Sequence, residues 1–394
     1  MVTTSTAARP TPVPFFDQRE SFTALWPLIR QHTEEVFDRG KFSHGRKVQE
    51  FERALAEYTG ARHAIAVNSG TDALVLLLRA AGIQPGDEVI VPAFSFFASA
   101  SAVTMARATP VFADITADGD YGMDAASVEA AVTERTRAIM PVHLFSQLAD
   151  MAALGAVAER HGLLVLEDSA EAIGMRWDGR HGGLLGTGGV LSFFPTKTLG
   201  ALGDAGAVLT DDGTLAERAG TLRHHGRMGR TIDHIAGISN LSGESGTNSK
   251  MDDVQAAVLL AKLSRLDQDI ARRRELADAY TERLRGTDGV LAVPRIVPRA
   301  AASDPVFYVY TIEVERRDGL AAHLTERGIG TETYYPRTIA SQPAYAELPA
   351  RPGGFPNAEA ACRRTIALPL YPDMTEAHVE SVCAAIADFY AGRQ

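Results

Sequence analysis

Between about residues 45 and 250, short apolar runs alternate with segments of helical periodicity. This alternation favours a strand, a crossover helix and a second, parallel strand as the repeating unit. The helical segments are Thr71–Ala81, Ser127–Thr133 and Met151–Arg160. The candidate strands are His63–Val67, Glu88–Val91, Thr109–Ala113, Ala138–His143, Leu163–Glu167, Val190–Phe194 and Ala207–Thr210. We therefore expect an α/β fold whose large domain has a mostly parallel, seven-stranded sheet between helices.

The remainder of the chain has a different pattern. Ser249-Lys-Met-Asp252 is a capping-box signature, and the amphipathic pattern after it predicts one long helix that ends near Leu284. Beyond Gly286 we expect a strand and two helices, at Phe307–Val314, Asp318–Arg327 and Thr375–Tyr390. The predicted organisation is an N-terminal arm and helix (1–44), a large domain (45–250), a connecting helix (251–285) and a small C-terminal α+β domain (286–394).

Composition and charge exclude several classes of protein. With 39 Lys and Arg against 49 Asp and Glu, the net charge is −10. This argues against binding nucleic acid or an anionic membrane through a global basic field. Cys362 and Cys383 are too few for a disulfide framework or a Cys-rich zinc site. No signal-peptide layout is present, and Pro92 interrupts the longest apolar run, so we expect a cytoplasmic protein that does not span a membrane.

A strand running through Val67 leads into Ser69-Gly70-Thr71 and then directly into a helical pattern. The free N–H groups at a helix start, two hydroxyl groups and a glycine that permits close approach together suit a phosphate group. A plain capped helix is the alternative, because Ser and Thr are ordinary N-cap residues.

The apolar run Leu163-Leu-Val-Leu ends in two carboxylates, Glu167 and Asp168. Open α/β sheets bind ligands beyond the carboxyl ends of their strands. An acid there can hold a positive charge such as a protonated ring nitrogen. The alternative is a structural aspartate that accepts hydrogen bonds from the next loop.

Lys197 follows another apolar run and has small, turn-forming neighbours. Burial would lower the pKa of its amine, which suits Schiff-base chemistry, although most loop lysines are solvated. Nine of the 35 glycines fall within Gly179–Gly206, where we expect the backbone to turn sharply and lie close to a bound group. A phosphate cradle, Asp168 and Lys197 in this order are the parts that hold pyridoxal phosphate.

With these motifs the chain resembles the DegT/StrS family of pyridoxal-phosphate-dependent sugar aminotransferases, which have the fold type I architecture. The resemblance runs from Pro14-Phe-Phe-Asp to the terminal helix. Its motifs, in family order, are Asn68-Ser-Gly-Thr-Asp-Ala-Leu, Val91-Pro-Ala-Phe-Ser-Phe96, Pro141-Val-His-Leu144, Glu167-Asp168, Ser192-Phe-Phe-Pro-Thr-Lys197 and Asn248-Ser-Lys-Met-Asp-Asp-Val-Gln-Ala-Ala257.

The resemblance implies a role for each matching position. Lys197 would form the internal aldimine and shuttle protons, Asp168 would pair with the pyridine nitrogen, and Phe96 would stack on the ring. Asn248 would reach the phosphate from the neighbouring subunit, which implies an obligate homodimer with shared active sites. The positions that would hold the phosphate within one chain are Gly70, Thr71, Asp72 and Ser192.

Several positions depart from the family pattern. Glu171 stands where the family commonly has Gln or His beside the cofactor's phenolic oxygen, so we expect it to be protonated or turned towards another partner. Lys250 replaces the usual Arg, while Tyr334 and Ala340 stand where His is frequent. The segment His234–Asn248 is longer than usual. Candidate substrate contacts are His143, Lys250, Tyr334 and Arg337.

One basic island stands out in this acidic chain. It is Arg223-His-His-Gly-Arg-Met-Gly-Arg230, which would suit the diphosphate of a nucleotide sugar. The alternative is a loop whose charges lie in water. No further ligand lies at suitable spacing to make His224 and His225 a metal site.

The leading hypothesis is transfer of an amino group from glutamate or glutamine to a keto sugar, expected to be nucleotide-linked. Such an activity belongs to the biosynthesis of an amino sugar for a specialised metabolite, such as an antibiotic, or for a surface glycan. One alternative is a non-nucleotide ketone such as a cyclitol. A dehydratase is disfavoured because such relatives tend to replace the lysine. A non-catalytic partner subunit is disfavoured because Lys197 and Asp168 are both present.

Overall fold

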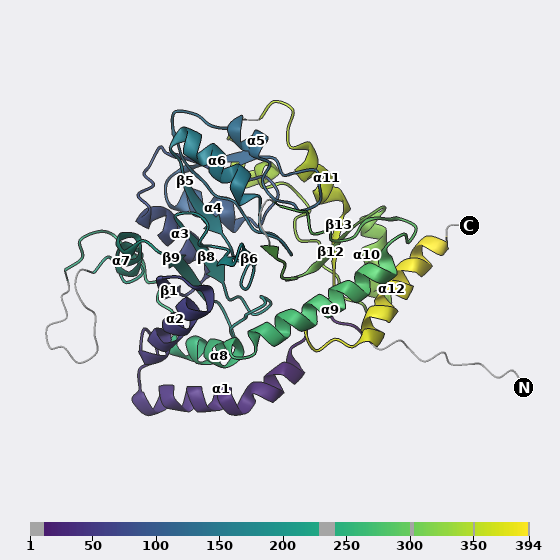
Figure 1. Ribbon diagram of the computed structural model, residues 1–394, viewed down its shortest axis with the longest axis horizontal. Helices are drawn as coiled ribbons and strands as arrows, with labels where there is room; N and C mark the ends of the chain where they lie inside the picture. Colours follow the sequence, from purple (N-terminus) through teal and green to yellow (C-terminus); the bar gives the residue numbers. More distant parts are fainter. Residues whose placement is uncertain (1–11, 228–240, 300–302, 350, 393–394) are drawn as a thin grey trace, which may run out of the picture.

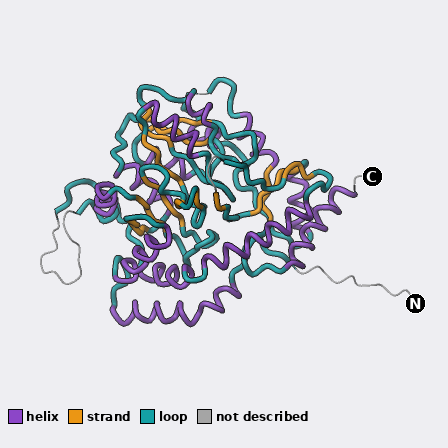
Figure 2. The backbone as a smooth tube through the Cα atoms, in the orientation of Figure 1, coloured by secondary structure: helices purple, strands orange, loops and turns teal. Residues whose placement is uncertain are grey.

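The computed structural model describes residues 12–227, 241–299, 303–349 and 351–392. Seven strands form the main sheet, in the order β1-β9-β8-β5-β4-β2-β3 (Figures 1 and 2). The pairs from β3 to β8 are parallel, whereas β9 is antiparallel to both β8 and β1. The strands are β1 (His63–Val67), β2 (Glu88–Pro92), β3 (Thr109–Ala113), β4 (Thr136–Ile139), β5 (Leu164–Asp168), β8 (Gly188–Ser192) and β9 (Gly206–Thr210). The expectation of a mostly parallel seven-stranded sheet is confirmed.

Helices cover both faces of this sheet, because each strand directs alternate side chains to opposite sides. In β2, for example, Val89 and Val91 pack in a different core cluster from Ile90. On one face lie α3 (Gly70–Ala80), α4 (Ala98–Met105) and α7 (Gly213–Leu222). On the other lie α5 (Ala125–Glu129), α6 (Met151–His161), α2 (Arg46–Thr59) and α8 (Asp253–Leu263).

The predicted connecting helix is two helices. α8 ends at Leu263 and α9 (Leu266–Leu284) begins after a break at Ser264 and Arg265. The break lets α8 pack on α1 (Arg19–Arg39) and α2, while α9 packs on α12 (Glu376–Ala391), as Figure 1 shows. The capping-box prediction was also wrong. Asp252 is the N-cap of α8 without a side-chain cap, and the Ser249 hydroxyl donates instead to Asp72 Oδ2 at 2.5 Å.

The C-terminal part packs on α9 and α12 around its own apolar core. Its three-stranded sheet has the order β10-β12-β13, and a second small sheet has the order β11-β6-β7. The predicted strand at Phe307–Val314 begins later, at Tyr310. The strands are β10 (Val290–Ala292), β12 (Tyr310–Val314), β13 (Thr365–Leu368), β11 (Ser303–Asp304), β6 (Arg176–Trp177) and β7 (Arg180–His181). The remaining helices are α10 (Arg317–Glu326), α11 (Pro356–Arg364) and the short 3₁₀ helices at Ile339–Ser341 and Pro343–Tyr345.

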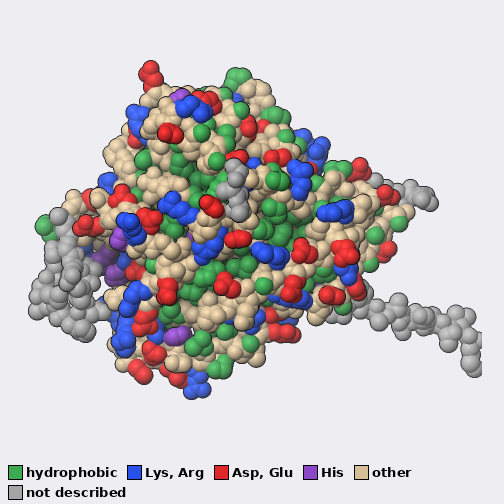
Figure 3. All heavy atoms as spheres, in the orientation of Figure 1, with side chains coloured by type: hydrophobic (Ala, Val, Ile, Leu, Met, Phe, Trp, Pro, Cys, Tyr) green, Lys and Arg blue, Asp and Glu red, His purple; other side chains and the backbone are tan. Residues whose placement is uncertain are grey.

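Two features of the structure bear on the expectations drawn from charge and hydropathy, namely the distribution of surface charge and the apolar character of the helices. On the face shown in Figure 3, Lys and Arg side chains are interspersed with Asp and Glu. Within the described ranges, no helix combines the length and the apolar character needed to cross a bilayer.

Candidate functional site

A pocket of about 580 Å³ lies at the carboxyl ends of the parallel strands. The end of β5, the end of β8 and the loops after β2 and β4 all contribute to its wall. This is where an open α/β sheet binds its ligand. Eight of the sequence-predicted site residues line this pocket: Gly70, Thr71, Phe96, Asp168, Glu171, Ser192, Lys197 and Tyr334.

The start of α3 forms one end of the pocket. Ser69 is the N-cap and its side chain accepts a hydrogen bond from the Asp72 N–H at 3.0 Å. β8 and β9 pack closely against the start of α3, and this close packing requires glycine at two positions. A Cβ on Gly70 would lie 2.8 Å from Ser192 Cβ, and a Cβ on Gly206 would lie 2.6 Å from the Ser69 carbonyl. Two glycines therefore let the helix start lie against β8 and β9, with N–H groups free for an anion.

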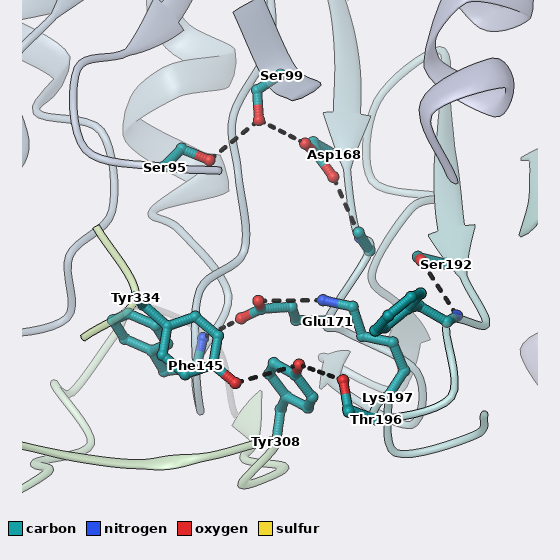
Figure 4. Close-up of polar contacts among 12 residues, drawn as sticks. Ser95, Ser99, Phe145, Asp168, Glu171, Ser192, Thr196, Lys197, Tyr308 and Tyr334 are labelled. Carbon is teal, nitrogen blue, oxygen red and sulfur yellow. Dashed lines mark hydrogen bonds and ion pairs between the residues drawn. The ribbon is translucent and has the colours of Figure 1, made fainter. Parts of the chain in front are cut away.

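Asp168 lies at the end of β5 and is only 4% exposed. Its Oδ2 accepts from the Ser99 hydroxyl at 2.7 Å and its Oδ1 from the Ala170 N–H at 3.3 Å. Since the single Ser99 proton points at the carboxylate, the Ser95 hydroxyl at 3.0 Å donates to Ser99 (Figure 4). Burial raises the pKa of Asp168, although both hydrogen bonds and the nearby Lys197 oppose the shift. The chain of two serines holds one carboxylate rotamer towards the pocket.

Lys197 lies on the loop after β8, with its side chain 15% exposed. Its Nζ is 3.2 Å from Glu171 Oε1 and 4.3 Å above the Tyr308 ring (Figure 4). The prediction of a lowered pKa was wrong. Burial is the largest single influence and lowers the pKa of the Lys197 amine, but Glu171, Tyr308 and Asp168 together outweigh it, and the net pKa lies above its usual value. The expectation that Glu171 turns towards another partner is met by Lys197 and by the Phe145 N–H.

Four predicted site residues lie outside the pocket wall of the single chain. Asp72 accepts from Ser249, the exposed Asn248 contacts Lys250 through its side-chain oxygen, and Arg337 is exposed. Burial and the neighbouring Arg227 and Arg223 lower the pKa of Lys250.

His143 is the fifth, and the structure corrects its assignment as a pocket residue. Its ring is fully buried. Nε2 donates to Glu167 Oε2 at 2.9 Å, and Nδ1 accepts from the Ala149 N–H at 3.1 Å. Glu167 also accepts from the N–H groups of Gly183 and Gly186, at 2.7 and 2.6 Å. Glu167 and Asp168 are neighbours in a strand and point to opposite faces, so His143 lies across the sheet from Lys197.

His143→Ala is therefore expected to act on stability. It removes one hydrogen-bond partner from a buried carboxylate and another from a buried N–H, which costs about 2–4 kcal/mol of unfolding free energy. Chemical denaturation at matched protein concentration measures this loss. His63→Ala, at an exposed ring on β1, is the control and should stay within about 0.5 kcal/mol. A stable His143→Ala protein with impaired ligand binding would contradict the assignment.

Tyr308, Phe145, Ser95 and Ser99 contribute to the site but were not predicted from the sequence. Ser95 lies in the loop after β2 and Ser99 in the first turn of α4, so their contact depends on the path of this loop, for which the spacing alone has no signature. Tyr308 and Phe145 had no local signal either, because they meet Lys197 and Glu171 only through long-range packing.

The basic island is described as far as Arg227, while Met228–Arg230 and residues 234–240 of the long segment predicted before Asn248 lie outside the described residues. Arg223 is bound to Glu52 and to the Ala66 carbonyl, which makes it structural. His224 stacks on His44 with ring centroids 5.6 Å apart. Burial and nearby cations lower the pKa of His44 to about 3 and of His224 to about 4. In the part of the chain described, no three His, Cys, Asp or Glu side chains are placed to hold a metal.

Comparison with known proteins agrees with this geometry. Residues 27–387 match the model of the DegT/DnrJ/EryC1/StrS aminotransferase family. A "pleiotropic regulatory protein" of Geobacillus stearothermophilus is 42% identical, over 96% of this chain and 98% of that protein. The dTDP-3-amino-3,4,6-trideoxy-alpha-D-glucose transaminase of Streptomyces venezuelae is 40% identical, over 96% of each. The crystal structure of S. venezuelae DesV with a ketimine intermediate superposes with a TM-score of 0.88 at 40% identity, covering 96% of this chain and 98% of that one. The chain belongs to the DegT/DnrJ/EryC1/StrS aminotransferase family.

Proposed function

We propose that this protein is a pyridoxal-phosphate-dependent aminotransferase that moves an amino group from glutamate or glutamine to a nucleotide-linked keto sugar. The observation that carries the proposal is the convergence of three parts on one pocket. A helix start with free N–H groups, the buried carboxylate of Asp168 and the secluded amine of Lys197 all line it. Each part is far from the others in sequence.

The residues present fit the cofactor. Gly70 and Gly206 let the start of α3 lie against β8 and β9, where a Cβ would clash with the Ser192 side chain or the Ser69 backbone. There the phosphate would accept hydrogen bonds from the helix N–H groups. Asp168 would face a protonated ring nitrogen, and Phe96, which is 62% exposed in the single chain, would cover the ring. When bound, pyridoxal phosphate supplies an electron sink for the amino acid carbon.

This chain's own residues then have separable tasks. Lys197 would hold the cofactor carbonyl and would carry a proton at its Nζ between the substrate carbon and the cofactor carbon. Asp168, held by Ser99 and the Ala170 N–H, would keep the ring nitrogen protonated. Tyr308 and Tyr334, whose hydroxyls lie 3.3 Å apart, would form the wall that excludes water from the reacting carbon.

The relative from S. venezuelae is named as a dTDP-sugar transaminase, which supports the nucleotide-linked acceptor. A cyclitol or another small ketone remains the second candidate, because Tyr334, Ala340 and Lys250 depart from the family pattern. The Geobacillus relative is named as a regulatory protein, so a non-catalytic role is the competing hypothesis.

A homodimer is part of the proposal. The exposed Asn248 and its neighbour Lys250 would approach the phosphate of the partner's site. Large apolar side chains lie exposed beside the pocket of the single chain, which a second copy would cover: Phe96, Phe194 and Leu202. Shared sites would complete the cofactor pocket, which one chain leaves open.

Borohydride trapping tests the cofactor and the acceptor in turn. The purified protein is loaded with pyridoxal phosphate, reduced and digested, and we expect the cofactor mass on the peptide that contains Lys197. Loading with amino donor and candidate acceptors before reduction should trap an adduct whose mass shows whether a nucleotide is present. Label on other lysines alone would support the non-catalytic class, and an adduct without a nucleotide would exclude the nucleotide-linked acceptor.

A further inference from the structure

The amine of Lys197 has a carboxylate beside it that the family pattern did not predict. Its Nζ lies 3.2 Å from Glu171 Oε1, and the Glu171 side chain is only 6% exposed. A buried ammonium is costly unless an opposite charge lies within hydrogen-bond reach. Glu171 meets this requirement by direct contact.

The position of Glu171 depends on an unusual turn at Phe145. The Phe145 N–H donates to Glu171 Oε2 at 2.9 Å, and Phe145 has a φ of 62°, in the left-handed region. A non-glycine residue there costs about 1–3 kcal/mol and persists only where the surroundings enforce it. The Phe145 ring is held by stacking on Tyr335, at 6.1 Å, and by edge contacts with Tyr121 and Phe94, at 5.3 and 6.3 Å. Aromatic packing thus keeps the N–H aimed at the carboxylate.

The same turn also anchors Tyr308, on the other side of the amine. The Tyr308 N–H donates to the Phe145 carbonyl at 2.9 Å, and the Tyr308 carbonyl accepts from the fully buried Arg273 at 2.9 Å. Phe145 therefore ties together both groups that contact Lys197 Nζ (Figure 4).

We propose that Glu171 is the counter-ion of the Lys197 amine and that the left-handed turn at Phe145 positions it there. Glu171 holds the free amine in its ammonium form, and this proton must leave before the nitrogen can attach to a carbonyl. The cofactor's involvement rests on the proposed function, but the ion pair is a property of the protein without cofactor.

The charged and titratable groups facing the amine are Glu171, Asp168 and Tyr308, and they outweigh the effect of burial on the Lys197 pKa. Tyr334 and Tyr335 also lie near Glu171, and burial, with a further contribution from Glu171, raises the pKa of both phenols, which stay neutral. Without the Glu171 charge, burial of Lys197 should dominate and its pKa should fall.

The direct test measures the Lys197 pKa in the cofactor-free protein. Lysines are reductively methylated with ¹³C-formaldehyde, the Lys197 signal is assigned by its absence in Lys197→Ala, and its shift is followed with pH. We expect the midpoint in Glu171→Gln to fall by at least about one pH unit, a tenfold change in the neutral amine. Glu332→Gln is the control, because Glu332 lines the same pocket but does not contact Lys197. An unchanged midpoint in Glu171→Gln overturns the proposal.

Two further variants extend the test. One distinguishes loss of the Glu171 charge from a general disturbance of the fold, and the other tests whether Phe145 positions Glu171. Glu171→Asp keeps the charge and should restore a midpoint closer to that of the original protein than Glu171→Gln does. Phe145→Leu loses the ring contacts that enforce the turn, so its Lys197 midpoint should also fall. If Phe145→Leu retains the original midpoint, the positioning half of the proposal is wrong.

A kinetic measurement gives an independent readout. At pH 7.5, appearance of the bound cofactor's visible band should be at least about tenfold faster in Glu171→Gln, because more of the amine is neutral. An equal or slower rate counts against the ion pair. If the original protein takes up no cofactor, the proposed function fails, while the methylation result still decides the role of Glu171.

Discussion

Lys197→Ala is expected to lower transaminase turnover by at least about 10³-fold, because it removes both the covalent attachment point and the group that carries the proton. The visible band of the bound cofactor should shift, and borohydride should no longer fix cofactor mass to the protein. Stopped-flow absorbance and peptide mass spectrometry measure the two effects.

Lys197→Arg is the matched control for charge. It keeps a cation beside Glu171 but cannot form the covalent attachment. We expect Lys197→Arg to be as inactive as Lys197→Ala, with a folded structure by circular dichroism. Substantial turnover in either variant would exclude the assignment of Lys197.

Gly206→Ala is expected to destabilise the protein and to weaken cofactor binding together. The added Cβ would lie 2.6 Å from the carbonyl carbon and oxygen of Ser69 and 2.7 Å from the Gly70 nitrogen, all of them backbone atoms. The start of α3 must therefore shift. We expect a loss of about 1–3 kcal/mol of unfolding free energy from overpacking. The shifted N–H groups should also weaken cofactor phosphate binding by at least about tenfold, measured by titration of the visible band.

Gly220→Ala is the matched control for Gly206→Ala. Gly220 lies in α7, and a Cβ there would meet no atom within 4 Å. In a helix interior the change should be neutral or stabilise by up to about 1 kcal/mol. If Gly206→Ala changes neither the unfolding free energy nor cofactor binding more than Gly220→Ala does, the close approach of β9 to the start of α3 is not what shapes the phosphate site.

The glycine-rich stretch Gly179–Gly206 has a different role in the structure from the one that the sequence predicted. The excess of glycine in Gly179–Gly206 predicted sharp turns and close approach to a bound group. In the structure, a Cβ on Gly186 would meet the Val165 carbonyl and one on Gly200 the Pro195 carbonyl. Close approach is therefore largely between segments of the chain itself, and only at the start of α3 does it form the wall of the pocket.

The boundaries that the sequence predicted well are those with strong local signals. β1, β2 and β3 begin where predicted, because apolar runs and turn residues delimit them. β4 ends at Ile139 rather than at His143, since Pro141 lacks the N–H of a ladder residue. The division of the predicted connecting helix into α8 and α9 follows from packing on two different partners, for which the apolar periodicity has no signature.

The sequence by itself determined the fold class, the family and the order of the cofactor-facing motifs. These follow from local patterns, namely strand periodicity, a capped helix start after β1, and an acid and a lysine at strand ends. Only the tertiary structure decided the side of the sheet on which His143 lies, the partner of Glu171 and the direction of the Lys197 pKa shift. Each of these depends on which distant side chains meet in a buried space, where the neighbouring groups together decide whether the effect of burial on a pKa prevails.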